Sequence, residues 1–433
     1  MLLFILKQEA SMTDLSVTEI DINKIKPYKN NPKSHNKKQI SQIMGSIKEF
    51  GFINPILIDE NGEIIAGHGR YLAAQAMNMT NVPAIVLSHL SSVQKRMYRI
   101  ADNKLTELGK WSPELLEIEF KELSMLDTSI DLEITGFETE EIDKFILSGN
   151  KQSDPKEEEV PMLSDADKRC SNGDIWQLGR HFLICGDALK SETYTTLLGN
   201  NRAQMILTDP PFNDSVADIG SMGKIKHDEF AMASGEMSSD EFTKFLMTFM
   251  QHAKNYSVDG SLHYLFMDWR HVLEISTAAA KIYDELKNIC IWVKNNGGMG
   301  SLYRSQHELC FIYKNGKEPH INNINLGAHG NYRTNVWQYA GANGSAEGRE
   351  NLKLHPTVKP VSMLKDAILD VTKRGDIVLD CFLGSGSTMI ACEQVGRTCY
   401  GIELEPKYCD VTIKRYEQLT GEKAIKIGGT DDR

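Results

Sequence analysis

Hydrophobic and polar positions divide the first part of the 433-residue chain into short alternating segments. Apolar runs at 56–59, 63–67 and 82–87 alternate with helical patterns such as Gln39–Phe50. Short apolar runs bounded by turn residues predict strands, and a 3.6-residue period predicts a helix. We therefore expect a compact α+β unit within residues 17–87.

The pattern changes after this unit. Residues 91–147 are mainly helical by pattern, with helix starts favoured at Ser112–Pro113 and at Thr139. Residues 148–168 are polar and acidic, contain proline and show no sustained period, which is typical of a linker. The expected boundaries are a first domain at 15–112, a helical extension at 113–147, a linker at 148–168 and a second domain at 169–425.

In the second domain, apolar runs alternate with helical stretches. The expected strands are His181–Cys185, Met205–Thr208, Leu262–Met267, Ile289–Val293, Leu309–Tyr313, Ile377–Leu379 and Thr398–Ile402. The expected helices include Ser239–Tyr256, Val361–Arg374 and Pro406–Leu419. Such alternation predicts an α/β fold with a mainly parallel sheet covered on both faces. Ligands of such sheets bind beyond the carboxyl ends of the strands, so the residues there are the first candidates for chemistry.

Composition narrows the class of protein. With 41% hydrophobic and 25% charged residues, the chain is typical of a globular protein. The apolar start MLLFIL is too short to span a bilayer, so no membrane partner is expected. The eight cysteines include no C-x-x-C pair, so the spacing expected of a zinc site or of a disulfide framework is absent. We expect a cytoplasmic protein without a metal.

The net charge of −11 argues against a nucleic-acid partner, because phosphate contacts usually need a basic surface. The distribution of charge weakens this objection. Between Lys287 and Lys359 there are nine Lys or Arg, four Glu and no Asp. This segment is either a locally positive DNA-facing surface or an ordinary solvated one.

The strongest candidate for chemistry is Asp209-Pro210-Pro211-Phe212, which follows the apolar run MILT. Methyl transfer to a base amine needs acceptors for the two amino protons, because the nitrogen lone pair is otherwise conjugated into the ring. The Asp209 carboxylate and the Pro210 carbonyl can accept both, and Phe212 can stack on a base rotated out of the duplex. A plain turn after a strand is the alternative.

A second candidate is the segment Asp380–Thr388, placed between a strand and a helix. Its glycines, Gly384 and Gly386, allow close approach of a ligand, and the helix start offers backbone N–H groups. Glu403 ends the next strand, where an acid accepts bonds from ribose hydroxyls in nucleotide-binding folds, although it could equally cap the following helix. Asp187 is a third acid at a strand end.

A third candidate is His355-Pro356-Thr357-Val358-Lys359-Pro360, directly before the helix predicted from Val361. Thr357 and Lys359 could bind the carboxylate of an amino-acid cofactor. A simple helix start is the alternative.

Taken together, these segments resemble the amino-methylating DNA methyltransferases of the permuted, beta-type order. The resemblance covers about 174–419 and rests on LTDPPFN, HPTVKPVSML, VLDCFLGSGST and GIELEPKYCD, in the family's order. It implies an S-adenosylmethionine-dependent methyltransferase sheet of Rossmann-like type in permuted order, acting on double-stranded DNA. Target recognition would lie at about 314–353, and Cys381 stands where the family more often has proline. A homodimer is left open.

The resemblance also implies roles for single residues. Asp209, Pro210, Pro211 and Phe212 would be catalytic. The cofactor would contact Asp187, Thr357, Lys359, Asp380, Phe382, Gly384, Ser385, Gly386, Thr388 and Glu403.

The amino-terminal unit resembles the ParB/sulfiredoxin-like domain, through PILIDENGEIIAGHGRYLAAQAM and VPAIVL. In that family the turn Gly67-His68-Gly69-Arg70 approaches nucleotide phosphates. The sulfiredoxin cysteine is absent here, and the arginine cluster of partition proteins is reduced to Arg70. Nucleotide binding, DNA docking and a purely structural role all stay open for this unit.

The function expected is methylation of adenine N6 in DNA. Methylation of cytosine N4 is the alternative within the class, since both targets are exocyclic amines. An alternative of another class is a non-catalytic ParB-like DNA-binding regulator, which the intact Asp209, glycines and Glu403 disfavour. RNA or a protein amide is a further alternative as substrate.

Overall fold

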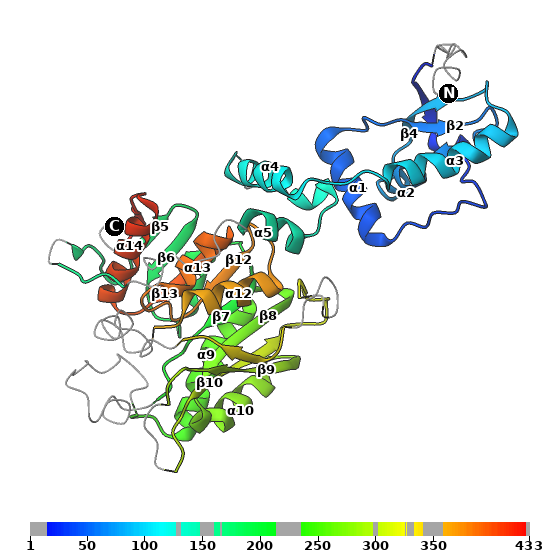
Figure 1. Cartoon of the computed structure of the whole chain (residues 1–433). Coiled ribbons are helices and arrows are strands. Elements are labelled where there is room, and N and C mark those ends of the chain that lie inside the picture. Colours follow the sequence, from blue (N-terminus) through cyan, green and yellow to red (C-terminus); the bar gives the residue numbers. More distant parts are fainter. Residues whose placement is uncertain are drawn as a thin grey trace. The chain divides into compact units, whose positions relative to one another are not determined.

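The computed structural model describes residues 15–126, 131–147, 160–164, 167–213, 235–297, 302–324, 326, 333–340 and 358–429 (Figure 1). The chain forms two compact units, residues 1–146 and 147–433. Within the described residues, no helix combines the length and apolar character needed to cross a membrane.

The first unit is built on a four-stranded sheet in the order β1-β4-β2-β3. Its strands are β1 (Thr18–Asp21), β2 (Ile56–Ile58), β3 (Ile64–Ala66) and β4 (Asn81–Val86). Its helices are η1 (Ile22–Lys24), α1 (Lys37–Phe50), α2 (His68–Ala76), α3 (Ser92–Thr106), α4 (Pro113–Leu126), η2 (Leu132–Thr135) and α5 (Thr139–Leu147), the last of which ends at the unit boundary.

Capping residues explain where two of these helices begin. The Asn36 side chain accepts a hydrogen bond from Gln39 N at the start of α1. Ser91 and Gln94 form a reciprocal capping box at the start of α3. The strands that the apolar runs predicted are present as β2, β3 and β4, and the predicted starts of α4 and α5 are confirmed.

The second unit is built on a ten-stranded sheet in the order β11-β9-β10-β8-β7-β12-β13-β6-β5-β14. Its strands are β5 (Ile175–Leu178), β6 (His181–Cys185), β7 (Ala203–Thr208), β8 (Ser257–Met267), β9 (Glu285–Val293), β10 (His307–Lys314), β11 (Val336–Gln338), β12 (Ile377–Asp380), β13 (Thr398–Glu403) and β14 (Ile425–Gly428). Its helices include α7 (Ser191–Leu198), α9 (Ser239–Asn255), η4 (Trp269–His271), α10 (Val272–Ile282), α12 (Val361–Val371), α13 (Ser387–Val395) and α14 (Pro406–Thr420).

The five central strands, β8-β7-β12-β13-β6, are all parallel, and antiparallel pairs flank them on both sides. The sheet is therefore parallel where its two faces are covered, as predicted, and mixed at its edges. β5 and β14, which the sequence pattern did not single out, form one of these edges.

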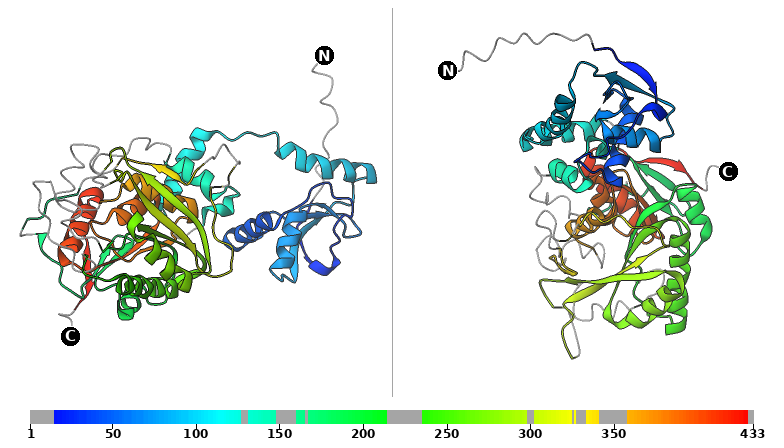
Figure 2. Two further views of the ribbon diagram at one scale, coloured as in Figure 1. Left: turned by 90° about the horizontal axis from the view of Figure 1, so that it is seen from below. Right: turned by 90° about the vertical axis from the view of Figure 1, so that its right-hand side faces the viewer.

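Helices cover both faces of this sheet. Buried side chains of α7, α9 and α10 pack in one hydrophobic cluster, and those of α12, α13 and α14 pack in another. Figure 2 shows the green helices α9 and α10 on one side of the unit's sheet and the orange and red helices on the other. Burial of both faces explains the long apolar runs in the central strands.

Candidate functional site

Three acidic residues follow three neighbouring strands of the large sheet. β7 ends directly before Asp209, β12 ends at Asp380, and β13 ends at Glu403. β12 pairs in parallel with both β7 and β13, so the three carboxyl groups lie at the same edge. Asp187 follows β6, the next strand along, two residues after its end. The four acids that were predicted from their positions at strand ends therefore lie at the same edge of the ten-stranded sheet.

The turn at Asp209 is fixed by its surroundings. Pro210 is buried, while Pro211 and Phe212 are half-buried. Phe212 packs against both hydrophobic clusters of the unit. Asn213 adopts a positive φ of 58°, and its side-chain amide donates to Met237 O at 2.8 Å. These contacts hold the carboxyl end of β7 in one conformation.

Lys359 joins Asp209 to a second carboxylate, Glu308. The Lys359 Nζ atom lies 2.5 Å from Asp209 Oδ2 and 3.0 Å from Glu308 Oε2. Lys294 pairs with the other oxygen of Glu308. The Lys359 side chain is only 7% exposed, so this ammonium depends on its two carboxylate partners for stabilisation.

Aromatic rings complete the environment of this ammonium. The Lys359 Nζ atom lies 5.0 Å from the ring centre of Phe266, 5.6 Å from that of Phe212 and 5.9 Å from that of Trp292. Ring faces attract a cation at such distances. Lys359 is therefore held at Asp209, and its nitrogen has no described contact with the loop Asp380–Thr388.

The charges shift one another's pKa values. Burial raises the pKa of Asp209 to about 6, although the adjacent Lys359 opposes the rise. Burial also disfavours ionisation of Glu308, but Lys359 and Lys294 outweigh it and lower the pKa of Glu308 to about 2. The two carboxylates raise the pKa of Lys359 despite its burial. Near neutral pH the group contains two anions and two cations.

The two carboxylate oxygens of Asp209 differ in their contacts. Asp209 Oδ1 is buried and has no hydrogen-bond partner among the described residues. A buried acceptor without a donor costs roughly 1–3 kcal/mol, so a donor from a ligand or from water would stabilise this oxygen. The unfilled acceptor at the end of β7 is suited to a ligand N–H group.

Asp380 holds the loop that follows β12. Its Oδ1 accepts from Thr208 Oγ1 at 2.7 Å and from Phe382 N at 3.1 Å. Its Oδ2 accepts from Thr388 Oγ1 at 2.7 Å. Both oxygens are engaged and the residue is buried, so Asp380 positions the loop and the end of β7.

The glycines of this loop are needed for its conformation. Gly386 has a φ of 83°, and a Cβ there would lie 2.8 Å from the Thr412 side chain. Gly384 has a φ of 56°. α13 begins directly after Gly386, which offers no side-chain cap, so the first N–H groups of the helix are open to a ligand.

The other loop residues have different surroundings. The ring centre of Phe382 lies 5.1 Å from that of Phe249 and 5.9 Å from that of Phe245, both on α9. Ser385 is buried, and its carbonyl accepts from Arg415 Nη1 at 3.1 Å. Phe382 and Ser385 thus contribute to packing of the loop.

Glu403 is a buried acid that contacts the same loop. Its Oε2 accepts from Gly384 N at 2.8 Å, and its Oε1 accepts from Glu405 N at 2.9 Å. Burial raises the pKa of Glu403 to about 7. Asp187 is more exposed, with an oxygen that accepts from Leu189 N at 2.9 Å. Each of these carboxylate oxygens has a second lone pair for a ligand hydroxyl.

Not every predicted residue can be placed. Thr357 lies outside the described residues, as do 325, 327–332 and 341–353 of the expected target-recognition segment. Within the described part, Arg333 Nε lies 2.6 Å from Asp370 Oδ2 on α12. β11 pairs in parallel with β9. These contacts attach residues 333–340 to α12 and to β9 of the ten-stranded sheet.

Glu308 was not among the candidates from the sequence. It lies in the run HELCFIYK, which becomes β10, directly before the apolar residues 309–313. An acid next to an apolar run within one strand is the signal that could have identified it, because an ionised carboxylate is seldom buried without a partner.

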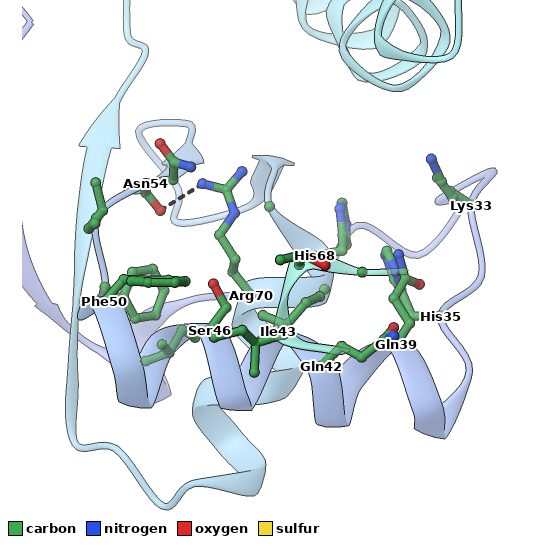
Figure 3. A pocket seen from close by; sticks show the side chains of 18 of the residues that line it. Lys33, His35, Gln39, Gln42, Ile43, Ser46, Phe50, Asn54, His68 and Arg70 are labelled. Carbon is green, nitrogen blue, oxygen red and sulfur yellow. Dashed lines mark hydrogen bonds between the residues drawn. The ribbon is translucent and has the colours of Figure 1, made fainter. Parts of the chain in front are cut away.

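The first unit contains a separate cavity of about 640 Å³. Gly67, His68, Gly69 and Arg70 line it, together with Lys33, His35 and residues of α1 (Figure 3). Gly67 has a φ of 99° and precedes α2 without a side-chain cap. The predicted nucleotide loop therefore lies at a cavity and at a helix start.

Two side chains of this loop are already engaged. Arg70 Nη1 donates to Asn54 O at 2.6 Å, the dashed bond in Figure 3, and to Pro55 O at 2.9 Å. His68 Nε2 accepts from Tyr28 N at 3.3 Å. Burial lowers the pKa of His68 to about 4, so its imidazole is neutral near pH 7.

Comparison with known proteins supports two families. A family model described as DNA methylase matches residues 203–414, and the ParB N-terminal domain model matches residues 6–104. A ParB-methyltransferase HTH domain model matches residues 114–169, where the sequence analysis expected a helical extension and a linker.

Individual relatives agree with these matches. The ParB-like nuclease domain-containing protein YnaK of Escherichia coli is 48% identical over 82 residues, which are 19% of this chain and 94% of YnaK. The type II methyltransferase M.HpaI of Haemophilus parainfluenzae is 24% identical over 251 residues, 54% of this chain and 74% of its own. The solved PvuII DNA methyltransferase, described as cytosine-N4-specific, has a TM-score of 0.44 at 15% identity and covers 58% of this chain and 94% of its own.

Proposed function

Because the chain belongs to the N6/N4 DNA methylase family and carries a ParB N-terminal domain, we propose that it transfers the methyl group of S-adenosylmethionine to N6 of adenine in DNA. Action on an exocyclic amine of DNA follows from the family. The choice of adenine, the cofactor and the roles of single residues are the proposed parts.

The main support for this proposal is Asp209 Oδ1, a buried acceptor without a hydrogen-bond donor in the described part of the chain. The Oδ2 atom of Asp209 is held by Lys359 at 2.5 Å, and Oδ1 is buried without a partner among the described residues. An amino group of a base can donate one N–H to Oδ1 and the other to the Pro210 carbonyl. These two bonds draw the nitrogen lone pair out of conjugation with the ring and direct it at the methyl group.

The residues fit the proposed cofactor. Glu403 can accept ribose hydroxyls through its remaining lone pairs, and Asp187 lies beside it beyond β6. Gly384 and Gly386 leave the open start of α13 free of side chains. When bound, S-adenosylmethionine supplies an electrophilic methyl group on a positively charged sulfur. In this site Lys359 is placed to hold Asp209, so a cofactor carboxylate would need other partners, of which the start of α13 is one.

Asp209 can also stabilise the positive charge that develops on the amine nitrogen. As the nitrogen forms its bond to carbon, the bond from that carbon to sulfur breaks and the nitrogen becomes positive. The Asp209 carboxylate stabilises this charge, and the surplus proton can pass to it, since the pKa of Asp209 is about 6. Phe212, half-buried beside Asp209, provides a ring face for the rotated base.

Adenine is favoured over cytosine because Asp209, rather than a serine, occupies the first position of the catalytic turn. The link between this aspartate and adenine is carried over from the resemblance to the family. Cytosine N4 uses the same two hydrogen bonds and is the alternative within the class.

We expect that the full chain, incubated with labelled S-adenosylmethionine and unmethylated genomic DNA, places label in N6-methyladenine. The measurement is digestion of the DNA to nucleosides and identification of the labelled one. Asp209→Ala should lower incorporation at least about 100-fold, the effect of losing one electrostatic group at a reacting centre. Asp240→Ala, which removes an exposed acid of α9, is the control and should leave incorporation unchanged. Label in N4-methylcytosine would establish the alternative, and no label in DNA despite cofactor binding would contradict the proposal.

The ribose role of Glu403 leads to a second expectation. At pH 8.5, where Glu403 with its pKa of about 7 is ionised, Glu403→Gln removes a charged acceptor, worth roughly 1.5–3 kcal/mol, so the dissociation constant for S-adenosylmethionine should rise about 10- to 150-fold. Equilibrium dialysis measures it, and Glu192→Gln at an exposed site of α7 is the control. Urea unfolding without cofactor separates loss of binding from loss of fold. An unchanged dissociation constant in a folded variant refutes the ribose role.

A second candidate function concerns the cavity of the first unit. We propose that it binds a nucleoside triphosphate, because the loop Gly67–Arg70 and the uncapped start of α2 lie at its wall. Lys33 is a basic side chain of the same cavity wall (Figure 3), 3.5 Å from Glu107 Oε1. Its charge can complement the phosphates.

A thermal-shift titration of the full chain with CTP and with ATP tests whether the cavity of the first unit binds a nucleoside triphosphate. Occupancy at 100 times the dissociation constant stabilises a protein by about 2.7 kcal/mol, so a clear rise of the unfolding midpoint is expected. Lys33→Met should weaken the response, whereas Lys24→Met, outside the cavity wall, should not. No shift with either nucleotide, or equal shifts in both variants, would show that the cavity does not bind nucleotide.

A further inference from the structure

Three cysteines far apart in the sequence meet in the second unit. The sulfur atoms of Cys170, Cys185 and Cys409 all lie within 4.8 Å of one another. Cys170 precedes β5, Cys185 ends β6, and Cys409 lies in the first turn of α14. Their spacing in the chain follows no metal-binding pattern, so only the fold reveals this thiol cluster.

The distances are close to those of a thiolate metal site. Zinc–sulfur bonds are about 2.3 Å long, so sulfur ligands of a tetrahedral zinc ion lie about 3.8 Å apart. The three sulfurs, all within 4.8 Å of one another, are at most about 1 Å further apart than that. Among the described residues, the other five cysteines belong to no comparable group of three possible ligands.

Buried hydrogen bonds fix the backbone of the thiol cluster. Asp410 Oδ1 accepts from Arg169 N at 3.0 Å and from Cys170 N at 2.9 Å. Gly173 N donates to Cys185 O at 2.7 Å. Asp410 follows Cys409 directly, so a single buried carboxylate aligns two of the three cysteines. In metal sites, hydrogen bonds from neighbouring residues orient the metal ligands in this way.

The surroundings also suit a negatively charged sulfur. The indole Nε1 of Trp176 is buried without a hydrogen-bond partner among the described residues. The guanidinium of Arg169 lies 5.5 Å from the ring centre of Trp176. In the thiol form, the Cys185 and Cys409 sulfurs are directed to the carbonyls of Leu404 and Glu403, at 3.7 and 3.9 Å. The indole N–H of Trp176 thus lies beside Cys170, whereas the Arg169 guanidinium is paired with Glu417 Oε1 at 3.2 Å.

We propose that Cys170, Cys185 and Cys409 bind one thiophilic divalent cation of the zinc class. Binding releases three thiol protons to solvent and forms three metal–sulfur bonds. The half-buried Cys170 gives access from solvent, where a water completes the fourth position. The ion ties the segment before β5 to β6 and to α14, next to the backbone of Glu403. This site does not depend on the proposed catalytic function.

The test uses the full chain, purified with a non-thiol reductant, stripped of metal with a chelator and titrated with Co²⁺ alone. Thiolate ligands give Co²⁺ a charge-transfer absorption in the near ultraviolet, and one equivalent per chain is expected. Zn²⁺ should then displace Co²⁺ and raise the thermal unfolding midpoint.

Variants identify the ligands. Cys170→Ser, at the half-buried position, and Cys409→Ser should each lower the affinity at least about tenfold and remove the Zn²⁺-dependent rise of the midpoint. Cys290→Ser, a buried cysteine of β9 outside the thiol cluster, is the control and should bind like the unaltered chain. Absence of a stoichiometric thiolate absorption, or an absorption that survives in Cys170→Ser, would overturn the proposal.

Discussion

A buried lysine ammonium lies between two carboxylates, and the candidate active site depends on this arrangement. Lys359, whose side chain is 7% exposed, contacts Asp209 at 2.5 Å and Glu308 at 3.0 Å. Any one of these charges alone would be costly to bury, but together they are stabilised. Because Lys359 holds one oxygen of Asp209, the other oxygen is fixed in place for a ligand. The turn Asp209–Phe212 is thereby ordered without a ligand, which is what the proposed positioning of a target amine requires.

The parallel centre of the large sheet provides the frame for this group. β7, β12 and β13 end side by side, and their terminal acids are buried in three different ways. Asp209 is paired with a cation, Asp380 accepts bonds from hydroxyls and a backbone N–H, and Glu403 accepts two backbone N–H bonds. Only the first leaves a buried oxygen without a partner among the described residues. The same edge of the sheet thus contains one acid with an oxygen free for a ligand and two that shape the neighbouring loop.

Much of this architecture could be predicted from the sequence, because it follows from local patterns. The apolar runs mark the central strands, and the strand-end rule brings Asp209, Asp380 and Glu403 together. The ion pairs of Glu308 and the thiol cluster could not be predicted, because both join residues distant in the chain. β5 and β14 were missed since each spans only four residues. The helix-turn-helix match at 114–169 falls on segments whose sequence shows only helical periodicity and a polar tract. Whether Glu403, Asp187 and Lys33 contact ligands stays a prediction.

The central claim is that an ionised Asp209, held by Lys359 beside Glu308, orients the target amine. The most direct measurement is the pH dependence of single-turnover methyl transfer, at saturating S-adenosylmethionine and DNA. The pKa of Asp209 is about 6, so the rate constant should fall as the pH drops through about 6, because the protonated acid accepts the amine less well. In Glu308→Gln, loss of a neighbouring negative charge lowers the pKa of Asp209, and the acid limb should move to lower pH. A rate constant that stays constant well below pH 6, or a limb that Glu308→Gln leaves in place, would contradict the account.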